Sequence, residues 1–258
     1  MNALAQSEPL NRVPEVTFDF WLIKLMAVTM GETAADYLAV NLGLGLTATS
    51  IIMTATLIVA IVLQFAQRRY MPAVYWAAVV LISVVGTLVT DNLVDNFGVP
   101  LEVTTVAFTV ALAITFAVWY SIERSLSIHT IFTARREAFY WLAIFFTFAL
   151  GTAAGDLIAE TFSFGYLTTA ILFLAVIAVI AALYYLLGLN SITAFWLAYI
   201  FTRPMGASLG DLMSQPVEYG GLGFGTIYTS VLFLGLIISI VIYMTLSQTA
   251  GEEREAAE

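Results

Sequence analysis

The stretch WLIKLMAVTMGETAAD, residues 21–36, decides the fold, because its framework of Trp21, Gly31 and Asp36 returns three more times in the chain. The same spacing recurs as Trp76, Gly86 and Asp91, then as Trp141, Gly151 and Asp156, and finally as Trp196, Gly206 and Asp211. A carboxylate inside apolar sequence is energetically costly and usually functional. Four carboxylates at equivalent positions predict one shared acidic site built from four equivalent helices.

The composition is typical of a membrane protein. Hydrophobic residues make up 61% of the chain and charged residues only 10%, with a mean hydropathy of +0.94. Several apolar runs reach the roughly 20 residues that a bilayer span requires. Cysteine is absent, which excludes disulfides, thiolate metal sites and haem attachment, and His129 lies in a polar stretch rather than a span. We therefore predict an integral membrane protein without a bound cofactor.

The four units are internal repeats. Successive Trp residues are 55, 65 and 55 residues apart, a period that marks repeat architectures. Each repeat holds two apolar segments joined by a short turn, often with Gly, which predicts a helical hairpin. The repeats 18–70, 73–125, 138–190 and 193–247 form a transmembrane domain (18–247) between an N-terminal segment (1–17) and an acidic tail (248–258). Expected helices cover residues 18–40, 46–65, 74–94, 103–121, 139–159, 167–187, 193–213 and 226–246.

The repeats should all have one orientation, because each contains an even number of spans. The arginines of the connections lie on the face that holds both termini, whereas the turns within repeats carry no Lys or Arg: Arg12, Arg68, Arg69, Arg124, Arg135, Arg136 and Arg254. The positive-inside rule then places both termini in the cytoplasm. The predicted fold is an all-α membrane protein with eight transmembrane helices from four parallel two-helix repeats, in a bacterial cytoplasmic (inner) membrane.

Oxygen-bearing side chains flank each Asp on the same helix face, because residues four apart on a helix are neighbours. Four residues before the Asp stand Glu32, Thr87, Thr152 and Ala207, and four after it stand Val40, Asp95, Glu160 and Gln215. Such a set suits hard cations, including Mn²⁺, Ca²⁺, Mg²⁺ and Na⁺. We predict Asp36, Asp91, Asp156 and Asp211 as ion, metal or proton ligands, Glu32 as a fifth carboxylate, and Thr87, Thr152, Asp95 and Glu160 as supporting groups.

Two cations fall inside the predicted spans. Arg203 lies near mid-depth, where a guanidinium needs a carboxylate partner, and Glu32 or one of the four Asp residues is expected to supply it. Arg203 is interpreted as a counter-ion or gate, with a static ion pair as the alternative. Lys24, one turn past Trp21, lies near the inner interface and is expected to reach water by snorkelling, or else to join Arg203 as a counter-ion.

Small residues predict how the helices pack. Gly151 and Gly155 are four apart, as are Gly206 and Gly210, and such faces let helix backbones approach closely. The first helices of the repeats are therefore expected to form an inner ring, with the second helices as a shell facing lipid. The Trp residues that begin these first helices match an interfacial belt. In an alternative interpretation the Asp residues only hold helices together, by bonding Trp, Thr or backbone groups.

The four units resemble the bacterial membrane family described as a repeat of unknown function, in which four tandem two-helix repeats each carry a characteristic Trp. Residues 133–141 are similar to the central linker of that family, and the resemblance covers residues 18–247. It implies an eight-helix integral membrane protein. Residues 31–36 are also loosely similar to the Glu-x-Gly-Asp motifs of Mn²⁺/Ca²⁺ cation–proton exchangers, although the order of the residues differs.

These observations predict a transporter of a small cation, with exchange of a divalent metal for protons as its most specific form. Two alternatives remain: a transporter of a polar organic solute, and a membrane binding or sensor module with structural Asp residues. An enzyme is not expected, because Ser and Thr in the spans lack a His partner. The expected partners are the lipid bilayer, a small cation and protons, not nucleic acid. The sequence leaves the oligomeric state open.

Overall fold

The computed structural model describes residues 11–255, and this part of the chain is all-helical, with eight long α-helices. The first helices of the repeats are α1 (Phe18–Asp36), α3 (Pro72–Asp91), α5 (Ala134–Asp156) and α7 (Ser191–Ser214). The second helices are α2 (Leu46–Ala66), α4 (Leu101–Glu123), α6 (Tyr166–Leu187) and α8 (Thr226–Glu255). Their bounds follow the predicted ones closely, except at α5, which begins earlier, and at α8.

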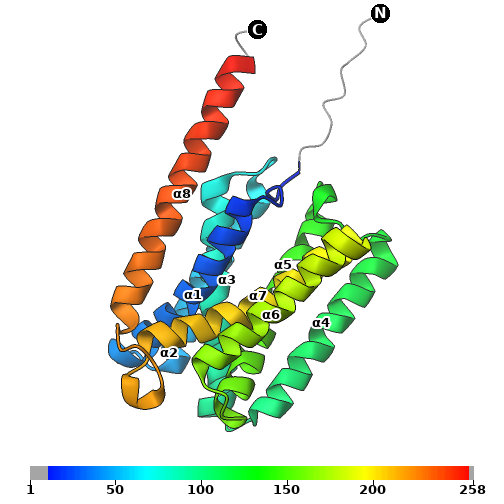
Figure 1. Ribbon diagram of the computed structural model, residues 1–258. Helices are drawn as coiled ribbons and strands as arrows, with labels where there is room; N and C mark the ends of the chain where they lie inside the picture. The colour runs from blue at the N-terminus through cyan, green and yellow to red at the C-terminus, as the bar shows by residue number, and fades with distance from the viewer. Residues whose placement is uncertain (1–10, 256–258) are drawn as a thin grey trace, which may run out of the picture.

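Helix α8 continues well past its predicted end, through most of the acidic tail, and extends beyond the other helices in Figure 1. The Glu, Ala and Arg residues of this stretch are good helix formers, so the helix has no local reason to stop where the apolar sequence stops. Residues 1–10 and 256–258 of the two predicted terminal segments lie outside the described residues.

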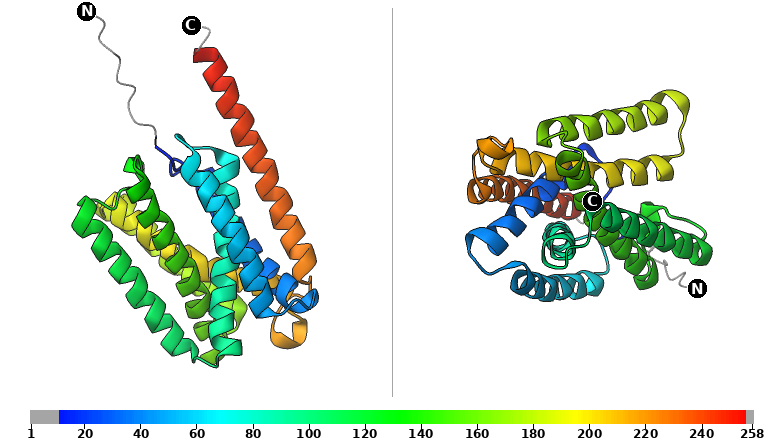
Figure 2. Two further views of the ribbon diagram at one scale, coloured as in Figure 1. Left: turned by 180° about the vertical axis from the view of Figure 1, so that it is seen from behind. Right: turned by 90° about the horizontal axis from the view of Figure 1, so that it is seen from below.

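The odd-numbered helices form a closed ring, as the small-residue pattern predicts. Helix α1 packs against α3 and α7, and α5 packs against the same two helices. Figures 1 and 2 show these four helices in the middle of the molecule, with α2, α4, α6 and α8 around them. The most apolar stretches of α3 and α5 are 67% and 56% buried, against 17–22% for the even-numbered helices. The protein core therefore lies along the axis of the ring.

The even-numbered helices pack differently from the prediction. A hairpin would place each second helix against the first helix of its own repeat, but α2 packs mainly on α3, α4 on α5, α6 on α7, and α8 on α1. The hairpin prediction is wrong in this respect, because the turn fixes only where the second helix begins. Each repeat thus covers its neighbour, and α8 closes the circle by joining the last repeat to the first.

The motif glycines explain how tightly the ring closes. At each of them an added Cβ would overlap the side chain that stands eight residues before the Asp of the neighbouring ring helix. The four pairs are Gly31 with Ser83, Gly86 with Phe148, Gly151 with Arg203, and Gly206 with Val28. The same contact therefore repeats around the ring, and each Gly provides the space that the next helix fills.

The two ends of the ring differ in character, and we name them the Asp end and the Trp end. At the Asp end, three ring helices change to a π-helical turn directly after the Asp: η1 (Tyr37–Asn41), η2 (Asn92–Asn96) and η4 (Leu157–Thr161). The fourth repeat instead has the short 3₁₀ helix η5 (Val217–Tyr219). π-Helical turns are rare and frequently mark functional sites.

Aromatic side chains fill the ring at the Trp end. Trp76, Trp141 and Trp196 are at most 5% exposed, and the Phe or Tyr that precedes each motif Trp stacks on it edge to face. The prediction of an interfacial Trp belt is therefore wrong for these three residues. The reason is that each of these rings packs against the aromatic residue that precedes the motif Trp of the repeat before it: Phe20 with Trp76, Tyr75 with Trp141, and Tyr140 with Trp196.

The described start of the chain also lies at the Trp end. Val13 is buried in the core, and the Arg12 guanidinium bonds to the fully buried carboxylate of Glu137 at 2.7 Å. Asn11 exchanges hydrogen bonds with the linker before α5, donating to the Ile128 carbonyl and accepting from the Ile131 amide. At the Trp end, this segment therefore connects the start of the first repeat to the start of the third.

Six of the helices are long and apolar enough to cross a membrane: the four even-numbered helices, α3 and α5. Helices α1 and α7 fall short by composition, because α1 carries Lys24 and Glu32 and α7 carries Arg203. These charges lie inside the ring, where protein surrounds them. The apolar even-numbered helices, with many exposed Ile, Leu and Val side chains, indicate a membrane protein.

Candidate functional site

Three of the motif Asp residues end their ring helices and Asp211 lies in the last turn of α7, so the ring brings all four to one end of the molecule. Asp211 is 7% exposed, whereas Asp36, Asp91 and Asp156 are half-buried. Glu32, which is 5% exposed and one turn before Asp36, lies near enough to all four for their charges to repel one another. We call these five residues the acidic cluster, and Glu32 is its common neighbour.

Most of the Asp carboxylates in the cluster lack a protein partner. Within the described residues, Asp91, Asp156 and Asp211 accept no side-chain hydrogen bond and form no ion pair, and Asp36 accepts one bond, from the Gln215 amide at 3.3 Å. Residues that serve only to hold helices together would be bonded to Trp, Thr or backbone groups. The unpaired carboxylates are therefore poorly explained by helix packing alone.

Arg203 lies at the centre of the ring and is fully buried. Its Nη2 atom is 3.1 Å from Oε2 of Glu32, as the sequence predicted, so the guanidinium has the carboxylate partner that its depth requires. The same nitrogen donates to the hydroxyl of Thr152 at 2.8 Å and to the hydroxyl of Thr87. Thr87 in turn donates to Glu32 at 3.1 Å. The two predicted supporting threonines thus bridge the ion pair.

Arg203 also bonds the backbone of its neighbours. Its Nη1 atom donates to the Val28 carbonyl at 3.2 Å and its Nε atom to the Phe148 carbonyl at 3.3 Å. Val28 and Phe148 stand at the positions in α1 and α5 that correspond to Arg203 in α7, eight residues before the Asp. One side chain from the last repeat therefore bonds all three other ring helices and occupies the axis directly below the acidic cluster.

The outer supporting carboxylates are less enclosed. Asp95 and Glu160 lie in the π-helical turns η2 and η4 and are exposed. Glu160 accepts a hydrogen bond from the Tyr166 hydroxyl at 3.2 Å. Both carboxylates interact electrostatically with the Asp residues of the cluster, so further negative charge lies beside it at the Asp end.

No ready-made metal centre exists in the described part of the chain, where no three Asp, Glu or His side chains are arranged to hold one ion. The four Asp residues, predicted as metal ligands, share an electrostatic field but not a coordination sphere. The physical reason is that each Asp lies on a different ring helix, while the Arg203 side chain fills the axis between these helices directly below.

Lys24 lies elsewhere than predicted. Its side chain does not snorkel but is fully buried, with Nζ donating to the Tyr199 carbonyl at 2.9 Å and lying 4.0 Å from the centre of the Tyr199 ring. Lys24 stands twelve residues before Asp36, and Tyr199 twelve before Asp211, so both belong to one level of the ring. Snorkelling fails because the aromatic residues at the Trp end block the route to water.

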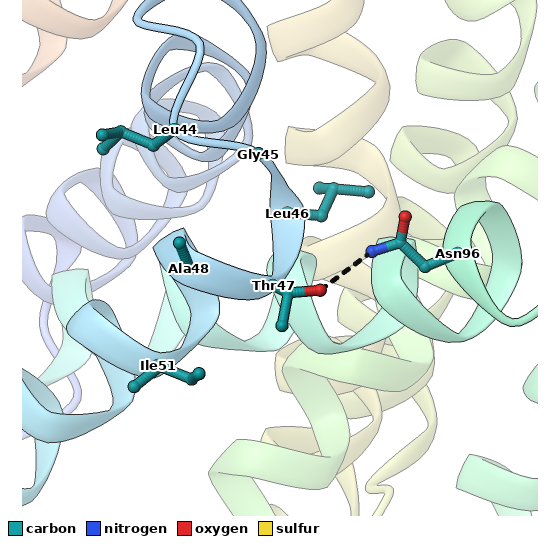
Figure 3. Close-up of a pocket in the computed structure, with 7 residues that line it drawn as sticks. All are labelled: Leu44, Gly45, Leu46, Thr47, Ala48, Ile51 and Asn96. Atoms are coloured by element: carbon teal, nitrogen blue, oxygen red, sulfur yellow. Dashed lines mark hydrogen bonds between the residues drawn. The ribbon is translucent and has the colours of Figure 1, made fainter.

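A groove at the Asp end is separate from the acidic cluster. It has a volume of about 430 Å³ and runs between the start of α2 and the turn η2, lined by Leu44, Gly45, Leu46, Thr47, Ala48, Ile51 and Asn96. Figure 3 shows its main polar contact, in which the Asn96 amide donates to the Thr47 hydroxyl at 3.3 Å. The groove opens at the outer, apolar surface of the bundle and contains no charged group.

Sequence reasoning missed the buried tyrosines. The hydroxyls of Tyr75 and Tyr140 are 2.5 Å apart inside the ring, and the hydroxyl of Tyr199 is buried without a hydrogen-bond partner within the described residues. A signal existed: the residue before each motif Trp is aromatic in all four repeats, as Phe20, Tyr75, Tyr140 and Phe195. An aromatic residue at a repeated position beside a Trp indicates an inward face rather than a belt.

Comparison with known families agrees with the repeat structure. The family model described as a Repeat of Unknown Function (DUF347) matches residues 20–70, 74–125, 139–189 and 194–250, one match for each repeat. The chain therefore belongs to this family. Among curated proteins and among solved structures, none matches the chain significantly.

Proposed function

We propose that this member of the four-repeat family is a membrane transporter that moves a small cation through the ring of odd-numbered helices in exchange for protons. The observation that carries the proposal is the acidic cluster with the buried Arg203 at its base. Three of its Asp carboxylates are partly exposed, and three of the four have no bonding partner among residues 11–255, which leaves them available to a cation from the Asp end.

In this proposal Arg203 acts as an internal substitute for the substrate. A guanidinium bonded to Glu32 neutralises the deepest carboxylate of the cluster while no other cation is present. An incoming cation competes for Glu32, so its arrival releases Arg203 and loosens the contacts that hold the other ring helices. Competition of this kind links cation binding to a change in helix packing.

The ring is closed at the Trp end, which fits one state of a transporter that opens to alternate sides. The aromatic side chains and the segment at Asn11 and Arg12 lie between the cluster and that end. Protons are a suitable counter-ion because clustered carboxylates repel one another and bind either a cation or protons. We further propose that all eight helices cross a bacterial cytoplasmic membrane, with the Trp end and both termini facing the cytoplasm.

The separation of the Asp residues bears on the substrate. Without three ligands in reach of one ion, a divalent metal would keep much of its hydration or would require the helices to move closer. The same separation favours, as a second candidate, a polar organic cation whose ammonium group pairs with one carboxylate while the rest of the molecule spans the cluster.

A cation screen tests the proposal. The purified full-length protein would be heated with MnCl₂, CaCl₂, MgCl₂, NaCl and simple alkylammonium salts, each matched in ionic strength with choline chloride. At least one cation should raise the melting temperature of the wild type and leave Asp156→Asn unchanged, because the amide keeps the shape but loses the charge. The control is Asp19→Asn, which lies in the first turn of α1, at the Trp end and away from the acidic cluster, and it should respond like the wild type. Equal responses of all three proteins to every cation would contradict the proposal.

A further inference from the structure

Lys24 is a buried charge that the proposed cation site does not use. It is fully buried, and no ion pair joins it to a carboxylate within the described residues. Its hydrogen-bond partner is the Tyr199 carbonyl, and its ammonium lies over the rings of Tyr199 and Phe148 at 4.0 and 5.7 Å. A lysine held in this way can exist with or without its proton, unlike an arginine.

The side chains that contact Lys24 come from α7 and α5, as Tyr199 and Phe148. Tyr75 on α3 and Tyr140 on α5 stand one turn nearer the Trp end, while Glu32 is two turns farther along α1. Lys24 and Arg203 both lie over the ring of Phe148, at 5.7 and 5.3 Å from its centre, so the two cations are close enough to repel each other. The repulsion is smallest while Glu32 holds and neutralises Arg203.

Two buried hydroxyls near the level of Lys24 have no hydrogen-bond partner within the described residues. One belongs to Tyr199, at the same level of the ring, and the other to Ser83, which stands one turn nearer the Asp end on α3. Farther toward the Trp end, the Tyr75 and Tyr140 hydroxyls bond to each other, and Tyr140 is one turn from Glu137 on α5. Hydroxyls can donate and accept, but none of these is within hydrogen-bond distance of the Lys24 amine, so a proton passes between them and the amine only when the side chains move.

We propose that Lys24 is the group that carries the exchanged proton, and that its protonation and the binding of a cation at Glu32 exclude each other. The inference rests on the proposed function. When a cation takes Glu32, Arg203 loses its neutralising partner and repels the Lys24 ammonium, which releases its proton to the Asp end. When the cation leaves, Arg203 returns to Glu32 and the amine takes up a proton from the Trp end through Tyr199. Each cycle moves the cation and the proton in opposite directions.

Two substitutions at Lys24 should have opposite effects on cation binding. Lys24→Met removes the charge and mimics the deprotonated amine, so it should tighten binding about tenfold, whereas Lys24→Arg keeps a permanent charge and should weaken binding about tenfold. Affinity would be measured near neutral pH by melting temperature against the concentration of MnCl₂, CaCl₂ or NaCl. A purely structural lysine would give losses in the same direction for both variants.

Proton movement supplies the second readout. In proteoliposomes with a pH-sensitive dye inside, cation entry through the wild type should raise the internal pH, and Tyr199→Phe should slow this change while cation affinity stays that of the wild type. If Lys24→Met does not fold, Lys24→Arg and Tyr199→Phe still decide the matter. Matching shifts of affinity in both lysine variants, or cation flux without proton movement in the wild type, would overturn the inference alone. Absence of any cation binding or flux in the wild type would overturn the proposed function and the inference with it.

Discussion

Arg203 Nη2 lies 3.1 Å from Glu32 Oε2, which joins the last repeat to the first at the centre of the ring. The four repeats differ at this contact. The positions that correspond to Arg203 carry Val28, Ser83 and Phe148 in the other three repeats. At this level, a ring with four-fold pseudosymmetry thus holds a single arginine bonded to a deep carboxylate of another repeat, and the first prediction depends on their pairing.

The ion pair should be strongly coupled in stability. Glu32→Gln or Arg203→Met alone leaves a buried charge without its partner, which should destabilise the fold by about 3–5 kcal/mol, whereas the double variant should lose clearly less than the sum. Denaturant unfolding in mild detergent measures these values. Asp95→Asn, at an exposed carboxylate, is the control and should change stability by at most about 0.5 kcal/mol. Additive losses would mean that the pair is not an energetic unit.

Gly151 should tolerate no side chain, because a Cβ there would overlap Cβ and Cγ of Arg203. Gly151→Ala is expected to destabilise the protein by about 1–3 kcal/mol despite the better helix propensity of Ala. The matched control is Gly155→Ala on the same helix, where the nearest atoms, all of Pro204, are 3.6–3.7 Å away and should accept a methyl group. The melting temperatures of the two variants test this. A larger decrease for Gly155→Ala than for Gly151→Ala would contradict the predicted packing.

The cyclic packing of the second helices can be tested with engineered disulfides, because the chain has no cysteine of its own. The hydroxyls of Thr33 on α1 and Ser230 on α8 are 2.7 Å apart. The pair Thr33→Cys/Ser230→Cys should therefore crosslink under mild oxidation and shift mobility on a denaturing gel. Ser50 is the equivalent of Ser230 in α2, so Thr33→Cys/Ser50→Cys is the matched control. A crosslink in the control pair and none in the first would restore the hairpin model.

Membrane orientation is a separate prediction. Reporters fused after Leu44, Gly98, Phe164 and Leu222 should report the outside, and those fused after Tyr70, Thr130 and Asn190 the cytoplasm, because the arginines lie on the second side. Alkaline phosphatase and fluorescent-protein activities of such fusions in cells measure this. One reporter on the wrong side would break the parallel-repeat topology, and inversion of all seven would reverse the Asp and Trp ends.

Much of the fold followed from the sequence because its signals are local. The apolar runs located the helices, the spacing of Gly151 and Gly155 identified the ring helices, and the depth of Arg203 demanded Glu32 as a partner. The features that the sequence did not predict all depend on which helices are neighbours in the folded protein, and no local pattern specifies those neighbours. A short turn does not say whether α2 packs on α1 or α3, and the burial of Lys24 and Trp141 follows from that arrangement rather than from their position along the helix.

Cation flux tests the central claim most directly. Wild-type protein and Asp156→Asn would be reconstituted in matched proteoliposomes, and uptake of Mn²⁺, Ca²⁺ and Na⁺ would be followed from acidic to neutral external pH. The account predicts uptake of at least one cation by the wild type, declining toward acidic pH as the carboxylates protonate, and its loss in Asp156→Asn at unchanged stability. Equal uptake by both proteins, or none by a folded wild type, would contradict it.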